Sequence, residues 1–144
     1  MRPAMQLREN LPTVMEKYRW HWQFVGVEVT DPNQRGAMGD TMLHFATELG
    51  ALEDIEVLVA SGANVNAVGD IGNTPLHSAA LLGEAAAAEK LLHLGADPSA
   101  KNDFGQTPAD VARLGDRHQL AQILAPRRPR HAKSGGKAGT GDRR

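Results

Sequence analysis

The 144-residue sequence contains no cysteine, which excludes disulfides, thiol catalysis and thiolate metal sites. Aromatic residues are scarce at 4% although 41% of the residues are hydrophobic, so we expect a core built from small helices. No run of about 18 apolar residues is present, and residues 1–15 contain charged side chains, so neither a membrane-spanning helix nor a signal peptide is predicted. These absences favour one domain in a reducing, cytoplasmic compartment.

The small net charge of −1 conceals a division along the chain. Residues 127–144 contain seven Lys or Arg and one acid, a net charge of +6, whereas residues 1–126 contain nine basic and sixteen acidic groups, a net charge of −7. The acidic part is expected to repel a phosphate backbone, while the basic segment would attract nucleic acid or another acidic surface, or fold back onto the acidic part. Nucleic-acid or acidic-surface association through the basic segment is therefore one candidate function.

A short phrase recurs three times at equal spacing along the chain. Its threonines are Thr41, Thr74 and Thr107, and each lies two positions after a glycine. Further columns keep the same interval: Ile55, Ala88 and Ala121, then Leu58, Leu91 and Leu124, and also Gly62 and Gly95. A fixed period of about 33 residues is typical of stacked repeats in which neighbouring units share one continuous core.

The letters of the phrase resemble a known family. Gly-x-Thr-Pro-Leu-His-x-Ala-Ala at 72–80 and Gly-Ala-Asp-Pro at 95–98 are similar to the ankyrin repeat, a unit of about 33 residues with a Thr-Pro-Leu-His signature. The resemblance is strong over 39–125 and weak over 11–38. It implies an all-α ankyrin-repeat solenoid of stacked helix-turn-helix units with projecting β-hairpin-like loops, and we expect a monomer.

The repeat divides the chain into six expected segments. They are a flexible N-terminus at 1–10, an N-terminal half-repeat cap at 11–38, ankyrin repeats at 39–71 and 72–104, a C-terminal capping repeat at 105–125, and a disordered basic tail at 126–144. Apolar side chains at helical spacing predict one amphipathic helix in the half-repeat cap, from Leu11 to Phe24 or Val25, with Asn10 as its N-cap.

The recurring letters also predict how each unit folds. Thr74 is expected to cap a helix whose first turn contains Pro75, and His77 is expected to bond back to this start. Gly50 and Gly83 are suited to the tight turn between the two helices. In the third unit the corresponding glycine comes one residue early, at 115 instead of 116.

Neither a metal site nor a catalytic site is predicted. Two of the six histidines, His44 and His77, are the motif residues that tie a loop to a helix start, and the others lack the His-x-x-x-His spacing of metal ligands. The acids are scattered, and the sequence has no Gly-x-Ser-x-Gly and no glycine-rich phosphate loop. We therefore expect no cofactor, no small-molecule substrate and no enzymatic activity.

The resemblance implies instead that loop tips and the exposed side of each first helix form a concave surface that binds another protein, as an adaptor or inhibitor. The corresponding positions are Arg35, Ala37, Met38, Asp40 and Glu48 in the first unit, Val68, Asp70, Ile71, Asn73 and Leu81 in the second, and Lys101, Asp103, Phe104 and Gln106 in the third.

Three of these positions are large apolar residues spaced one repeat apart, Met38, Ile71 and Phe104, which we call the tip ladder. Aspartates lie nearby in all three units, so the tip ladder predicts a partner with basic and apolar side chains. The alternative is that its side chains only stack on one another and stiffen the loops.

Aromatic residues concentrate in the half-repeat cap, where Tyr18, Trp20, Trp22 and Phe24 lie at alternate positions of one short segment. Tyr18 and Trp22 belong to the inward-facing stripe and are expected to seal the end of the stack. Trp20 and Phe24 are spaced i, i+4, so they form either a second, outward-facing stripe that binds a partner or part of a broad buried cap.

Overall fold

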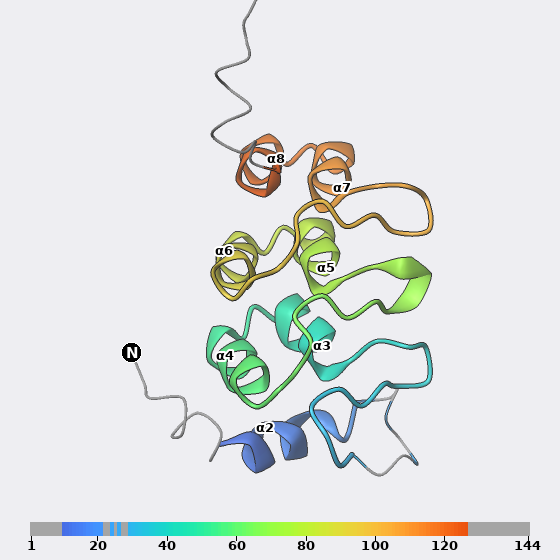
Figure 1. Cartoon of the computed structure of the whole chain (residues 1–144), viewed down its shortest axis with the longest axis vertical. Helices are drawn as coiled ribbons and strands as arrows, with labels where there is room; N and C mark the ends of the chain where they lie inside the picture. Colours follow the sequence, from blue (N-terminus) through green and yellow to red (C-terminus); the bar gives the residue numbers. More distant parts are fainter. Residues whose placement is uncertain (1–9, 22–23, 25, 27–28, 127–144) are drawn as a thin grey trace, which may run out of the picture.

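The computed structural model describes residues 10–21, 24, 26 and 29–126. Seven α-helices stack along one axis in this part of the chain, in agreement with the predicted all-α solenoid (Figure 1). They are α2 (Leu11–Tyr18), α3 (Met42–Glu48), α4 (Leu52–Ala60), α5 (Pro75–Leu82), α6 (Ala85–His93), α7 (Pro108–Leu114) and α8 (His118–Leu124). None of the described helices is long and apolar enough to cross a membrane.

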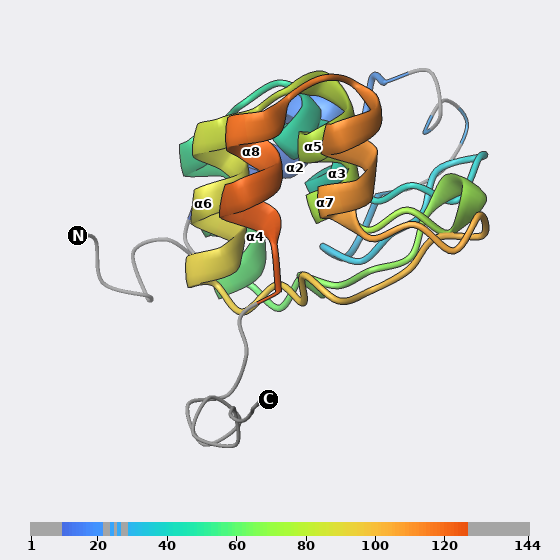
Figure 2. The same ribbon diagram turned by 90° about the horizontal axis from the view of Figure 1, so that it is seen from above.

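The helices form two layers. Seen from the end of the stack, α3, α5 and α7 make the inner layer, α4, α6 and α8 the outer layer, and the loops that precede the inner helices extend away from both (Figure 2). The β-hairpin-like character predicted for these loops is not shown, because the described residues contain no strand and only an isolated bridge between Arg35 and Thr41. One loop instead contains a 3₁₀ turn at Asp70–Gly72.

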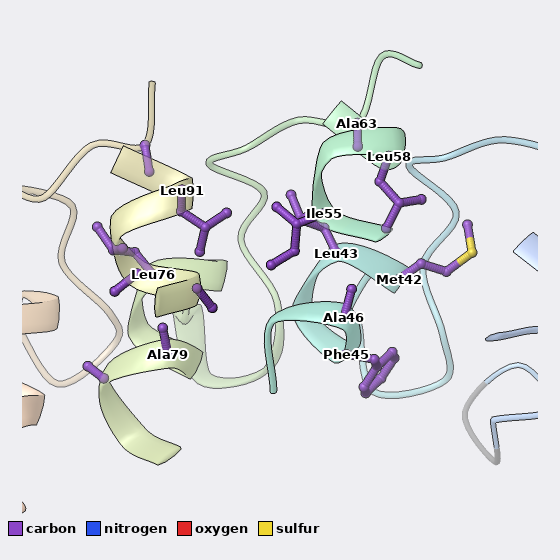
Figure 3. Packing of buried hydrophobic residues seen from close by; sticks show 14 of the residues in the cluster. Met42, Leu43, Phe45, Ala46, Ile55, Leu58, Ala63, Leu76, Ala79 and Leu91 are labelled. Carbon is purple, nitrogen blue, oxygen red and sulfur yellow. The ribbon is translucent and has the colours of Figure 1, made fainter. Parts of the chain in front are cut away.

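One continuous apolar core runs through the stack. Leu43 of α3 and Ile55 of α4 are fully buried, as are Leu76 of α5 and Leu91 of α6 in the following unit (Figure 3). These residues belong to a single cluster that extends from α2 to α8. No pair of helices covers its own apolar face, so each unit depends on its neighbours for stability.

The helix starts follow the predicted chemistry. The Thr74 hydroxyl accepts a hydrogen bond from the His77 backbone N–H at 3.4 Å, and Pro75 occupies the first turn of α5. Met42, which replaces the proline in the first unit, begins α3 and is completely buried. A proline is therefore not required for a helix to start at this position, since burial of the methionine side chain also stabilises it.

The half-repeat cap differs from its prediction. The helix ends at Tyr18, not near Phe24, because the chain turns there through hydrogen bonds from His21 N to Tyr18 O and from Phe24 N to His21 O, at 2.9 and 2.8 Å. The turns place Phe24 edge-to-face against Phe45 of α3, with ring centroids 5.8 Å apart. A straight helix would have left that part of the core uncovered.

This turn also corrects the prediction of a Trp20–Phe24 stripe. The Trp20 side chain is 71% exposed, whereas Phe24 is 1% exposed, so the two residues do not share a face. Trp22 and Val25, together with the segments 1–9 and 127–144, lie outside the described residues. The expectations for a flexible N-terminus and a disordered basic tail fall almost entirely on these segments.

A buried polar contact anchors the cap to the first full unit. The Tyr18 hydroxyl donates to Asp54 Oδ2 at 2.9 Å, and Lys17 Nζ lies 2.8 Å from the same oxygen. Burial, followed by the hydrogen bond and the charge of Asp54, raises the pKa of the Tyr18 phenol. The phenol therefore stays protonated and keeps donating to the carboxylate, which fixes α2 against α4.

In the third unit the glycine comes one residue early, at Gly115, but the residue with positive φ stays at the position that the repeat predicts. Gly50 and Gly83 have φ values of 65° and 76°, and the equivalent position of the third unit, Asp116, has φ 59°. Gly115 itself has an ordinary φ of −91°. The left-handed conformation thus occurs at the same position of all three units, and Asp116 adopts it because aspartate tolerates positive φ better than most other residues.

This geometry predicts the order of stability among substitutions of Asp116. A glycine adopts positive φ freely, whereas a β-branched residue is strained there by about 1–2 kcal/mol. Because the Asp116 side chain is 94% exposed, packing contributes little to the difference. We expect urea unfolding to rank Asp116→Gly above the wild type and the wild type above Asp116→Val, and equal stability of the two variants would contradict the assignment.

Candidate protein-binding surface

Each loop is closed by hydrogen bonds within its own backbone. In the second unit the Gly69 N–H donates to the Asn73 carbonyl at 2.7 Å, and in the third the Asn102 N–H donates to the Gln106 carbonyl at 2.9 Å. The Gly36 N–H makes the equivalent bond in the first loop. All three loops extend to the same side of the stack, one above another (Figures 1 and 2).

Motif histidines connect each unit to the next loop. His44 Nδ1 accepts from the Thr41 backbone N–H at 3.1 Å, so its proton resides on Nε2, which donates to the Asn73 carbonyl at 2.8 Å. His77 Nε2 likewise lies 2.8 Å from the Gln106 carbonyl. Both contacts confirm the predicted structural role. Within the described residues, no group of three or more His, Asp or Glu is arranged to hold a metal ion.

The last unit replaces this histidine with Asp110. Its Oδ2 accepts from the Thr107 backbone N–H at 3.0 Å, and this hydrogen bond is the main cause that lowers the pKa of the carboxyl. A carboxylate accepts hydrogen bonds but donates none. It therefore caps α7 as a histidine would. It has no N–H group like that of His44 or His77, which donates to the next loop.

Several residues predicted to bind a partner also hold the loops together. Arg35 Nη1 donates to the carbonyls of Gly39, at 2.7 Å, and Val68, and Asp40 Oδ1 accepts from the Asp70 backbone N–H at 2.9 Å. The Asn73 and Gln106 side chains both accept from Asn102 Nδ2, at 3.0 Å each. The polar positions at the loop bases are thus part of the framework.

The remaining predicted positions on the loops are mostly solvent-exposed. The tip ladder is 50% exposed at Met38, 45% at Ile71 and 70% at Phe104. The other exposed loop positions are Ala37, Val68, Asp70, Lys101 and Asp103. The loop tips therefore present apolar and charged side chains to solvent over all three units.

A backbone hydrogen bond links the loop that contains Ile71 to the loop that contains Phe104. Ile71 adopts a left-handed φ of 49°, and its carbonyl accepts a hydrogen bond from the Asp103 N–H at 3.0 Å. Gly72, next to it, has no room for a side chain, since an added Cβ would collide with the Asp103 carboxylate. The turn at Ile71 thus sets the distance between neighbouring loops.

Two predicted positions lie on the inner helices. Glu48, the last residue of α3, is half-buried, while Leu81 of α5 is 55% exposed. Burial and then the charge of Asp40 raise the pKa of Glu48, although the Ser78 hydrogen bond opposes them. Asp40 belongs to the loop that precedes α3. We call the angle between the inner helices and the loops that precede them the groove (Figure 2).

Sequence reasoning missed one residue of this kind. Leu114 ends α7, lies one repeat after Leu81 and is 73% exposed, more than any residue of the tip ladder. The repeat period, counted from Leu81, is the signal in the sequence that identifies it. Leu49 and Leu82, at the ends of α3 and α5, are also exposed, by 69% and 48%.

A comparison with models of protein families also identifies ankyrin repeats in this chain. A model described as ankyrin repeats, in three copies, matches residues 20–102, which is more than half of the chain. The match includes the segment before residue 39, where the resemblance of the letters is weak. It ends before the third copy of the phrase, where α7 and α8 nevertheless pair as α5 and α6 do (Figure 1). No curated protein matches the sequence.

The histidine bridges predict a loss of stability in mild acid. Burial lowers the pKa of His77 below its ordinary value of 6.5, and the hydrogen bond to Gln106 only partly opposes this effect. As the pH falls below 6.5, the unfolded chain therefore binds a proton before the folded chain does, so stability present above that pH is lost. We expect a decrease of at most about 1.4 kcal/mol per pH unit from this ring.

Urea unfolding between pH 7.5 and 5 measures this dependence. His77→Gln removes the titrating ring, so its unfolding free energy should fall less steeply with pH than that of the wild type. Identical slopes for the two proteins would show that His77 is not buried in its neutral form.

Proposed function

This chain belongs to the ankyrin-repeat family, and on that basis we propose that it is a non-enzymatic protein-binding module, an adaptor or inhibitor. The partner is held by the loop tips and by the groove along the inner helices. The observation that carries the proposal is the tip ladder: three large apolar side chains, exposed at matching positions of consecutive loops. Aligned apolar side chains of this kind are typical of protein interaction sites.

The loop framework supports the same function. The hydrogen bonds of Arg35, Asp40 and Asn102 tie neighbouring loops together before any partner is present. A surface that is already ordered loses less conformational entropy when it binds, and more of the contact energy then appears as affinity. The residues that fix the loops thus serve binding indirectly, and the side chains at the tips serve it by contact.

The conformation of Ile71 favours binding over the stiffening alternative. A β-branched residue at φ 49° is strained, and glycine or asparagine would fit this turn better. Strain of this kind is characteristic of functional positions, where the side chain contributes something other than stability. The apolar side chain at the tip supplies such a contribution if it contacts the partner.

Alanine substitution of the tip ladder tests the proposal. We expect the triple variant of Met38, Ile71 and Phe104 to lose a protein that the wild-type chain retains in affinity purification. A matched variant with Trp20→Ala and Ile123→Ala, two exposed apolar residues outside the loops, should retain it. Equal capture by both variants and the wild type would contradict binding through the loop tips.

Thermal unfolding of Ile71→Asn separates binding from stiffening. Asparagine tolerates positive φ, so relief of strain should raise the unfolding free energy by about 1 kcal/mol, and the melting temperature with it. If the Ile71 side chain instead stiffens the loops by packing on its neighbours, the same substitution lowers the melting temperature.

A further inference from the structure

Inner-helix ends supply a second row of side chains beside the tip ladder. Glu48, Leu81 and Leu114 occupy one equivalent position in the three successive repeats, and we call them the helix-end row. α3 packs against α5 and α5 against α7, so the row runs along the stack in that order (Figure 1). Its first member is acidic and the other two are apolar.

We propose that the bound segment of the partner places apolar side chains on Leu81 and Leu114 and a basic side chain on Glu48. The proposal rests on the proposed function and adds the chemistry and direction of the ligand: basic toward the first unit, apolar toward the third.

The row faces the groove. Burial and then the charge of Asp40, which lies in the loop before α3, raise the pKa of Glu48. The equivalent position on α5 and α7 has the same relation to the loops that precede those helices, because the helices are stacked repeats of one unit (Figure 2). By the repeat, we place Leu81 and Leu114 on the groove side of their helices.

Exposure makes these leucines available for contact. All residues of α3 from 42 to 47 and of α5 from 75 to 80 are buried, so only Glu48 of α3 and Leu81 and Leu82 of α5 reach solvent. Leu81 and Leu114 are 55% and 73% exposed and do not belong to the core cluster. Contact with apolar side chains of a partner would remove this surface from water, which favours binding.

Charge complementarity determines which side chain of the ligand can contact Glu48. The half-buried Glu48 carboxylate lies near a second carboxylate, that of Asp40, and both are unfavourable neighbours for a further acid. A Lys or Arg of the partner would offset the repulsion between the carboxylates, whereas an acidic residue would increase it.

The acidic character extends along the groove. Asp70 and Asp103 are exposed at the neighbouring loop tips, and residues 1–126 have a net charge of −7 in the sequence. At the far end Arg113 is paired with Asp110 at 2.9 Å, which leaves Leu114 as the exposed apolar end of the row. The exposed aspartates of the loops and the apolar end of the row thus both suit a segment that combines basic and apolar side chains.

Selection of displayed random peptides, long enough to span the three units, on the full chain tests this inference. We expect peptides that combine Lys or Arg with Leu, Ile or Phe, and at least tenfold weaker binding of the resulting peptide to a Leu81→Ser, Leu114→Ser double variant. Ile123→Ser, a substitution of an exposed residue on the outer layer, should leave the affinity unchanged. All substituted positions are exposed, and unchanged melting temperatures will verify that the variants fold.

A charge swap tests the direction of the ligand. Glu48→Lys should lose the basic peptide and bind a version in which Glu replaces its basic residue. Selected peptides that bind the helix-end variants normally but are lost with the tip-ladder alanine variant would overturn the inference and leave the proposed function standing. Failure to select any peptide would also overturn it, while capture of a folded partner would still decide the proposed function.

Discussion

The buried imidazole bridge is the interaction on which the rest of the structure depends. One ring accepts a hydrogen bond at the start of its own helix and donates another to the backbone of the next loop, as His44 does between Thr41 and Asn73. Loss of the donor would remove one of the two hydrogen bonds that the Asn73 carbonyl accepts, the other coming from the Gly69 N–H, and a hydrogen bond of this kind contributes about 0.5–1.5 kcal/mol. Helix start, loop position and the spacing of units are therefore set together by a neutral, buried side chain.

The proposed function depends on the exposed residues that are not part of the core, the helix caps or the histidine bridges. The residues that recur at the repeat interval build the core, the caps and the bridges, and none of them needs to change for the surface to change. Positions such as Met38, Ile71 and Phe104 are exposed at the loop tips, while Leu81 and Leu114 are exposed beside them on the inner helices. Because the core, the caps and the bridges do not fix these exposed positions, they are free to form the protein-binding surface that we propose.

Much of this architecture was predictable because it depends on local chemistry that repeats. The cap at Thr74, the bridge of His77 and the turn at Gly83 were all expected from the letters of the motif. The end of α2 was not, because apolar spacing is the same for a long helix and for a short helix followed by tight turns that bury Phe24. The proposed binding surface was the least predictable part, since sequence does not show that Arg35 bonds to loop carbonyls. Nor does sequence show that the chain at Asp116, between α7 and α8, keeps the left-handed turn.

Amide hydrogen exchange of the loops tests the central claim most directly. If the bridges hold the loops in place, the N–H groups of Gly69, Asn102 and Asp103 should exchange about as slowly as those in the middle of α5 at neutral pH, because each donates to a carbonyl within the framework. Exchange of these amides at the rate of an unfolded peptide, while α5 remains protected, would show that the loops are not ordered before binding and would contradict the account.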